Sequence, residues 1–170
     1  MRIASATLLL LLTLSAAHAQ PEGVEVSPKG GRFKVRFPGK PKETTAKTKT
    51  AVGEATVTTV TYATPEGSIY VATHIEYPTT PKADDHLTFL AGARDGIVGK
   101  DGKLVSEAPV SHGPDKLAGR EVVVDKGKVQ VRYRLFFKEN RLYQIGALGT
   151  GAFVTGKAAS DFLDSFEFVK

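Results

Sequence analysis

Alternating apolar and polar residues predict β-strands along most of this chain. The clearest case is RFKVRFPG, where odd-numbered positions are apolar, even-numbered positions are basic, and Pro38-Gly39 end the strand. A weaker, Thr-rich alternation over 43–52 predicts an exposed strand. The β-branched and aromatic runs at 54–64 and 68–77, separated by Pro65-Glu66-Gly67, predict a hairpin.

The spacing of the apolar residues changes after Pro81, from alternation to the spacing of a helix. Asp84 or Asp85 can cap its N-terminus, and Gly99 is placed to end it. The residues at helical spacing are Leu87, Leu90, Ala91, Arg94, Ile97 and Val98. Gly92 and Gly96 each weaken a helix by about 1 kcal/mol relative to Ala, so tertiary packing must hold this one.

Four further strands and a second helix follow. The strands are predicted at 103–110, 119–125, 128–138 and 141–148. Their connections are too short for parallel crossovers, so they form an antiparallel meander. An apolar stripe then predicts a helix through Ala158, Ala159, Phe162, Leu163 and Phe166, after which FEFV returns to an extended pattern.

The expected architecture is α+β, an antiparallel sheet of about seven or eight strands with two helices packed on it. The runs VVV (122–124) and LFF (135–137) do not alternate strictly. The central strands are therefore expected to be covered on both faces, in part by the helices.

The N-terminus predicts export. Residues 1–19 combine the positive Arg2, an apolar run over 8–14 and the small-residue cleavage signal Ala17-His18-Ala19, which indicates a cleaved secretory signal peptide. A retained anchor is the alternative. Residues 20–31, rich in Pro and Gly, are expected to be a flexible tether, and 32–170 a single domain in the periplasm or outside the cell.

Composition narrows the chemistry. The chain has no Cys, which excludes thiol catalysis, thiolate metal sites and a lipid-modified cysteine after the signal. Loss of Arg2 with the signal lowers the formal net charge from +5 to +4. A mildly basic exported domain suits anionic surfaces such as lipid headgroups or wall polymers. Nucleic acid is not expected, because no reading helix is predicted and export leads away from it.

Two short stretches resemble the PsbP-like class of exported domains. These are Phe33-Lys-Val-Arg-Phe-Pro38 in the opening strand and Phe162-Leu-Asp-Ser-Phe166 at the end of the closing helix. The tryptophan usual after such an opening strand is missing. The resemblance implies an antiparallel sheet sandwiched by helices, and a binding or assembly role more than an enzyme. It carries over no site residues.

A near-match to a phosphate-binding P-loop lies at Gly151–Ala158. The pattern G-x-x-x-x-G-K is present, but Ala158 stands where a Ser or Thr would bind Mg²⁺. The preceding strand belongs to a meander and not to a parallel βα unit. We therefore expect the glycines to turn the last strand into the closing helix, and we expect no nucleotide or other cofactor.

Catalytic and metal-binding candidates are sparse. Asp84, Asp85, His86 and His112 have side chains that suit a divalent metal or a hydrolase, but their spacing matches no closed site. Helix capping explains the aspartates more simply. Ser111 and His112 are adjacent, which does not orient an imidazole on a hydroxyl, and no G-x-S-x-G or Ser-x-x-Lys motif occurs. An enzyme is not expected.

Basic residues gather on two predicted strand faces. The candidate face for an anionic partner consists of Arg32, Lys34, Arg36, Lys128, Arg132 and Arg134. If the two strands are neighbours, six cations form one surface. The alternative is a solvated face, or cations covered by helix carboxylates such as Asp161 and Asp164.

Three functional hypotheses follow. The first is a non-enzymatic exported domain that binds a partner protein or an anionic envelope component. The second is a carrier that holds a small apolar ligand or lipid between sheet and helix, with groups such as Phe89, Phe136 and Phe153. The third is a hydrolase or metal-dependent enzyme around Asp84, Asp85, His86 and His112.

Overall fold

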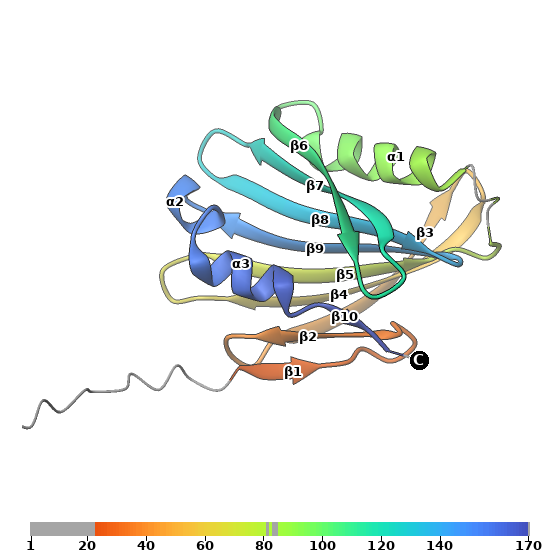
Figure 1. Ribbon diagram of the computed structural model, residues 1–170, viewed down its shortest axis with the longest axis horizontal. Coiled ribbons are helices and arrows are strands. Elements are labelled where there is room, and N and C mark those ends of the chain that lie inside the picture. The colour runs from red at the N-terminus through yellow and green to blue at the C-terminus, as the bar shows by residue number, and fades with distance from the viewer. Residues whose placement is uncertain (1–22, 81, 83–84, 170) are drawn as a thin grey trace, which may run out of the picture.

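The core of the protein is a seven-stranded antiparallel sheet, whose strands run across the picture in Figure 1. The computed structural model describes residues 23–80, 82 and 85–169. The spatial order is β3-β4-β5-β9-β8-β7-β6. The strands are β3 (Lys42–Thr50), β4 (Gly53–Ala63), β5 (Ile69–Glu76), β6 (Lys103–His112), β7 (Leu117–Asp125), β8 (Gln130–Lys138) and β9 (Arg141–Gly149). The predicted hairpin and meander are both confirmed.

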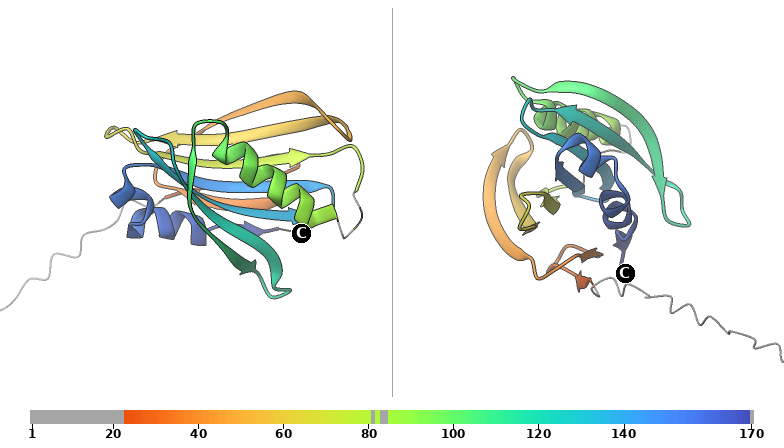
Figure 2. Two further views of the ribbon diagram at one scale, coloured as in Figure 1. Left: turned by 90° about the horizontal axis from the view of Figure 1, so that it is seen from above. Right: turned by 90° about the vertical axis from the view of Figure 1, so that its left-hand side faces the viewer.

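Two meanders meet at the centre of this sheet. One runs inward from the β3 edge to β5, the other inward from the β6 edge to β9, and β5 pairs with β9. The connection from β5 to β6 must therefore cross β9, β8 and β7 on one face. Helix α1 (His86–Val98) makes this crossing, which places it over the sheet (Figure 2).

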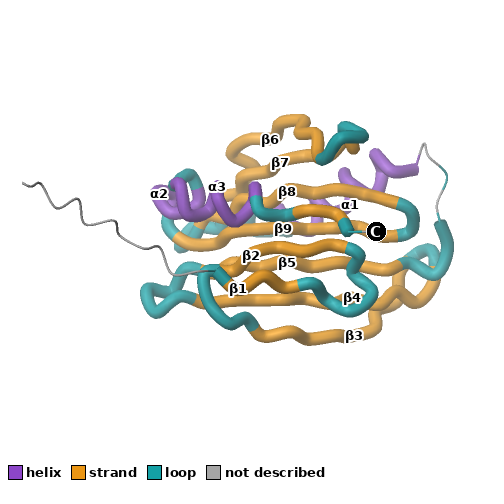
Figure 3. The backbone as a smooth tube through the Cα atoms, turned by 60° about the horizontal axis from the view of Figure 1, so that its bottom comes forward, coloured by secondary structure: helices purple, strands orange, loops and turns teal. Residues whose placement is uncertain are grey.

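The opposite face of the sheet is covered by a small second sheet and a helix. The small sheet has the order β1-β2-β10, with β1 (Val24–Val26), β2 (Phe33–Phe37) and β10 (Glu167–Phe168). It lies in front of the main sheet in Figure 3, with Phe33 packed edge-on against Tyr143 of β9 at 5.7 Å. Helix α3 (Lys157–Asp164) completes the cover with Phe162 and Leu163.

The small sheet corrects two expectations. Residues 24–26 lie inside the predicted tether, yet they pair with β2, Val26 opposite Val35. The strand has only three residues, and the Pro and Gly residues on both sides of it are typical of a loop, so the sequence pattern did not predict it. The opening strand itself pairs only with β1 and β10, so it is not a member of the main sheet.

The run LFF of β8 is buried on both faces, as its unbroken apolar pattern predicts. On β8, Leu135 and Phe137 pack on the α1 side, and Phe136 between them packs on the α3 side. The α+β class is confirmed, although the described residues form three helices rather than two. The additional one, α2 (Gly151–Val154), is a single turn.

The P-loop lookalike forms the passage from β9 to α3. The Thr150 hydroxyl caps α2 by accepting from the Phe153 N–H at 3.2 Å, and Gly156 is the residue before α3. The strand before this segment pairs antiparallel with both β5 and β8. A P-loop requires a parallel βα unit at this point, so the segment lacks the architecture of a P-loop.

Helix α1 ends at Gly99 as predicted, with φ of 58°, but its buried face differs from the predicted stripe. Leu90 is 2% exposed, whereas Leu87 is 60% exposed. The packed residues are Phe89, Leu90, Ala93 and Ile97. Asp85 precedes the helix, but its carboxylate accepts from the Lys82 N–H at 3.2 Å and caps no N–H of the helix. Asp84 lies outside the described residues.

None of the helices in the described part of the chain has the length and apolar content needed to cross a bilayer.

The two leucines of α1 allow a matched test of how the helix is held. We expect Leu90→Ala to lower the free energy of unfolding by about 2–5 kcal/mol, because it leaves a cavity under the helix. Leu87→Ala makes the same chemical change on the exposed side and is expected to cost less than about 0.5 kcal/mol. Urea denaturation of both variants measures the difference, and equal losses would contradict this packing.

Candidate functional site

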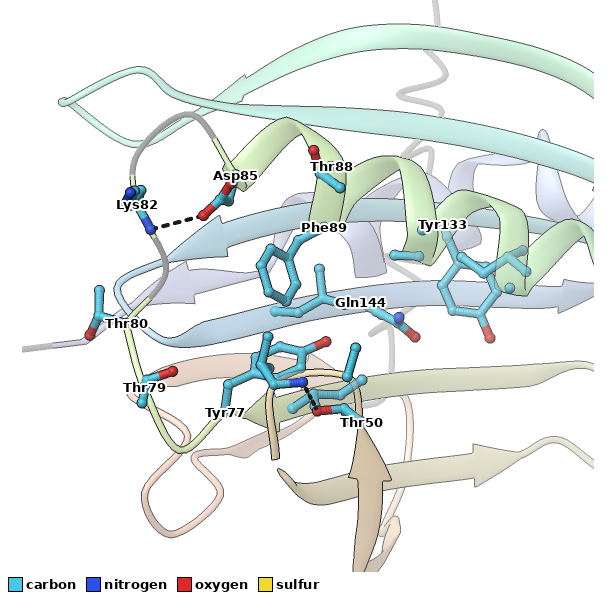
Figure 4. Close-up of a pocket in the computed structure, with 18 of the residues that line it drawn as sticks. Thr50, Tyr77, Thr79, Thr80, Lys82, Asp85, Thr88, Phe89, Tyr133 and Gln144 are labelled. Atoms are coloured by element: carbon cyan, nitrogen blue, oxygen red, sulfur yellow. Dashed lines mark hydrogen bonds between the residues drawn. The ribbon is translucent and has the colours of Figure 1, made fainter. Parts of the chain in front are cut away.

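A groove of about 1090 Å³ lies between α1 and the sheet, shown in Figure 4. The inner side of α1 forms one wall, and the tip of the β3–β4 hairpin (50–52) contributes to the other. The floor comes from β8, β9 and the end of β5, with apolar side chains that include Ile75, Val131 and Leu142. This volume slightly exceeds the range of about 300–1,000 Å³ that is usual for small-molecule sites.

The groove exists because α1 packs on only part of the sheet. The helix packs mainly on β7 and β8, where Leu90 belongs to the same buried cluster as Val122 and Leu135. The ion pair from Arg94 to Glu107 of β6, at 3.1 Å, fixes the helix toward that edge. The surface of β9 and β5 beside the helix is therefore left as a groove floor.

Small residues keep the helix wall open. Thr88, Gly92 and Gly96 follow one another at four-residue spacing along the groove. A Cβ atom added at Gly92 or Gly96 would meet no atom within 4 Å. Packing within the protein therefore does not demand glycine at either position, although each glycine weakens the helix.

The floor carries an aromatic ring laid flat on the sheet. Tyr133 of β8 lies directly opposite Gly146 of β9. A Cβ atom at position 146 would collide with the Tyr133 ring, so glycine is needed there for the ring to lie down. This explains a glycine in the middle of a central strand.

Two polar side chains point into the same part of the groove. They are the Tyr133 hydroxyl and the Gln144 amide, and neither is hydrogen-bonded to another residue drawn in Figure 4. A tyrosine hydroxyl is a neutral hydrogen-bond donor at physiological pH, and burial raises the pKa of Tyr133 further, to about 12.

The charged lining residues are at the two ends of the groove. Near the C-terminus of α1, the Lys126 ammonium donates to the Val98 carbonyl oxygen at 2.6 Å. Near its N-terminus lie Lys82 and Asp85. The arrangement is an apolar channel with charged ends, whose floor carries the neutral hydrogen-bonding groups of Tyr133 and Gln144 and which Tyr77 lines near the end of β5. Such a lining suits binding of an apolar molecule.

Of the three phenylalanines proposed for a carrier, only Phe89 lines this groove. Phe136 stacks on Phe166 on the opposite face of the sheet, at a ring separation of 5.7 Å. Phe153 packs against Tyr70 on that same face. The sequence did not assign a face to Phe136, because the directions of the LFF side chains depend on how β8 pairs in the sheet.

The candidate metal or hydrolase residues are not brought together. His86 packs on Phe137 of the α1 side, at 4.9 Å between ring centroids, whereas His112 packs on Phe136 and Phe166 of the opposite side. Within the described ranges, no group of three or more His, Asp or Glu side chains could hold a metal ion. The sheet separates Asp85 and His86 from His112.

The two basic strands are not neighbours, because β2 and β8 belong to different sheets. Two arginines of β8 share one carboxylate of β7: Glu121 lies 3.0 Å from Arg132 and 2.9 Å from Arg134. Burial opposes ionisation of Glu121, but hydrogen bonds from both arginines outweigh it and lower its pKa. Arg134 also meets Asp164 of α3 at 2.6 Å, and Arg132 donates to Ser160.

The remaining cations of the candidate face lie elsewhere on the surface. Arg32 pairs with Glu139 at 2.6 Å, and Lys34 with Glu167 at 3.1 Å. Arg36 reaches Glu25 at 3.9 Å. Lys128 is exposed in the turn before β8, and Asp161 pairs with Lys157. Whether any of these cations meets an anionic partner stays a prediction.

The groove residues were not predicted from the sequence as a site. The signal that could have found them is the pair Gly92 and Gly96, four residues apart in an otherwise amphipathic helix. A second signal is Gly146 in the middle of a strand, which indicates a close approach by another group.

A scan against protein-family models finds no match for this chain, and a search of curated proteins finds none either.

The buried histidine His74 gives a pH-dependent prediction. It is 2% exposed beneath β2, and burial, with a smaller contribution from Arg141, lowers its pKa, while Glu76 opposes the shift. Burial lowers the pKa of His112 as well. Below the ordinary histidine pKa of about 6.5, the unfolded chain therefore binds more protons than the folded one, and the free energy of unfolding falls as the pH is lowered.

We expect His74→Gln to reduce this loss between pH 7 and 5, measured by urea denaturation across that range. Thr58→Val is the control, because Thr58 lies opposite His74 on β4 and does not titrate. An unchanged pH slope in His74→Gln, or a reduced slope in Thr58→Val, would contradict the assignment to His74.

Proposed function

We propose that this protein is a non-enzymatic exported domain that binds a small, predominantly apolar ligand in the groove between α1 and the sheet. The observation that carries the proposal is the 1090 Å³ groove with apolar floor and walls. A groove of this size, with a few placed polar groups, is the usual form of a small-molecule site.

The glycines of α1 support the proposal. In a helix, Gly92 and Gly96 each cost about 1 kcal/mol relative to Ala, and they face open space rather than a packed neighbour. A ligand that lies against the helix backbone would explain why both positions are glycine. Glycines on the outer side of α1 would have no such connection with the groove.

Binding through the basic residues has less geometric support. Arg132 and Arg134 already pair with Glu121 of β7. Arg132 also donates to the Val154 carbonyl oxygen of α2 and to Ser160 of α3, and Arg134 pairs with Asp164 of α3, so the two arginines tie both helices to the sheet. The two basic strands lie in separate sheets. Export rests on residues 1–19, which lie outside the described part, and PsbP-like membership rests on two short stretches; both stay parts of the proposal.

The groove can be filled from α1 without disturbing the core. We expect Gly96→Leu to raise the free energy of unfolding by up to about 1 kcal/mol, because leucine is a far better helix former than glycine. The same change places a side chain where the ligand would lie. We expect it to weaken binding of the neutral apolar dye Nile red by at least about tenfold, measured by fluorescence titration.

Gly96→Ala is the matched control. Alanine gives the same improvement in helix propensity but adds only one methyl group to the groove. It is expected to stabilise the protein equally and to change Nile red affinity little. If Gly96→Leu binds Nile red as tightly as the wild-type protein does, the proposed site is wrong.

The natural ligand can be sought by native mass spectrometry of the exported protein, gently purified. Wild-type protein is expected to retain a bound apolar molecule that organic solvent extracts, and Gly96→Leu is expected to lack it. A clean unliganded mass for wild-type protein, together with no dye binding, would contradict a carrier.

A further inference from the structure

We propose that the ligand of this groove is an elongated apolar molecule with an uncharged carbonyl group, an ester or an amide, which Tyr133 and Gln144 bind. This inference rests on the proposed function and adds the chemical class of the ligand. It depends on the polar groups of the groove floor, whereas the proposed function depends on the shape of the groove.

The strand register puts both polar groups on one face. Tyr133 on β8 is opposite Gly146, and Gln144 lies two residues before Gly146 on β9, so both side chains project from the same side of the sheet. Gly146 lets the Tyr133 ring lie down over β9, toward the strand that carries Gln144. Figure 4 shows both side chains on the floor of the groove beneath α1.

Their hydrogen-bonding capacity suits a carbonyl oxygen. The tyrosine hydroxyl donates one hydrogen bond, and the glutamine NH₂ group donates as well. An oxygen with two lone pairs accepts from both. The glutamine oxygen is then free to accept from an amide N–H if the ligand has one.

A pure hydrocarbon would fit the walls but not this part of the floor. It would strip water from the Tyr133 hydroxyl and the Gln144 amide without replacing the hydrogen bonds that they lose, which is unfavourable. A carbonyl at this position satisfies both groups while the rest of the ligand contacts apolar surface.

An ionised carboxylate is disfavoured at the same place. Among the described lining residues, the cations are Lys82 and Lys126, which lie at the two ends. Lys126 already donates to the Val98 carbonyl oxygen at the C-terminus of α1. Burial raises the pKa of Tyr133, which indicates that this part of the floor penalises negative charge.

The length of the ligand follows from the helix. The groove follows α1 from Asp85 and Thr88 to Ile97, and a helix of 13 residues is about 20 Å long. An extended alkyl or isoprenoid chain matches a channel of this form, and a compact ligand would leave much of the wall beside Gly92 and Gly96 uncovered.

The test is displacement of Nile red from the whole domain by ligands of one chain length. Dodecane, methyl dodecanoate, dodecanamide and sodium dodecanoate differ only at one end. We expect the ester and the amide to displace the dye at roughly tenfold lower concentration than dodecane or dodecanoate, the scale of one or two net hydrogen bonds.

Variants assign this preference to the two residues. Tyr133→Phe and Gln144→Leu are each expected to weaken ester and amide binding by about 3–10-fold and to leave dodecane binding unchanged or tighter. Tyr62→Phe is the matched control, because it removes a tyrosine hydroxyl on the opposite face of the sheet. It is expected to change none of the affinities.

Failures of the two proposals can be told apart. If all four ligands displace the dye equally, or if Tyr133→Phe and Gln144→Leu change nothing while Gly96→Leu still blocks dye binding, the carbonyl inference is overturned and the groove stands. Tightest binding by dodecanoate would also overturn it, in favour of an anionic lipid. If Gly96→Leu binds dye normally, the proposed function itself fails.

Discussion

The structure depends on covering both faces of the β8–β9 hairpin. These strands lie at the centre of the sheet, and their side chains are apolar in both directions, with Leu135 and Phe137 facing one way and Phe136 and Tyr143 the other. Neither face can be left to water without losing much of the free energy that holds the domain together. The chain provides two different covers, a helix on one side and a small sheet with a helix on the other.

The two covers differ in completeness, and the difference creates the groove. On the β2 side, aromatic rings from three segments interlock, with Phe33, Phe166 and Phe168 all packed against Tyr143. On the other side, a single helix carries two glycines and packs mainly over β7 and β8. One face is therefore a close-packed core, whereas the other has a groove with an apolar floor beside a helix that carries small residues.

Strand β8 contributes to both sides because its successive side chains point to opposite faces of the sheet. Arg132 and Arg134 point toward α2 and α3 and share Glu121, so their charges hold the helices in place. This ion-pair network is half-buried. Removing one of its members would leave the charges of the others uncompensated, so the helices and the sheet are coupled at this position. Tyr133, between the two arginines, faces the groove, where Gly146 gives its ring room.

Local pattern determined the strands, the two longer helices and the need to cover β8 on both faces, because side-chain periodicity reports which positions meet apolar surroundings. Pairing partners decided the rest. The short strand at Val24–Val26, the separation of β2 from the main sheet and the opposite positions of His86 and His112 follow from contacts between distant segments. The groove belongs to this second class, since neither Gly96 nor Tyr133 indicates open space until the helix is laid across the sheet.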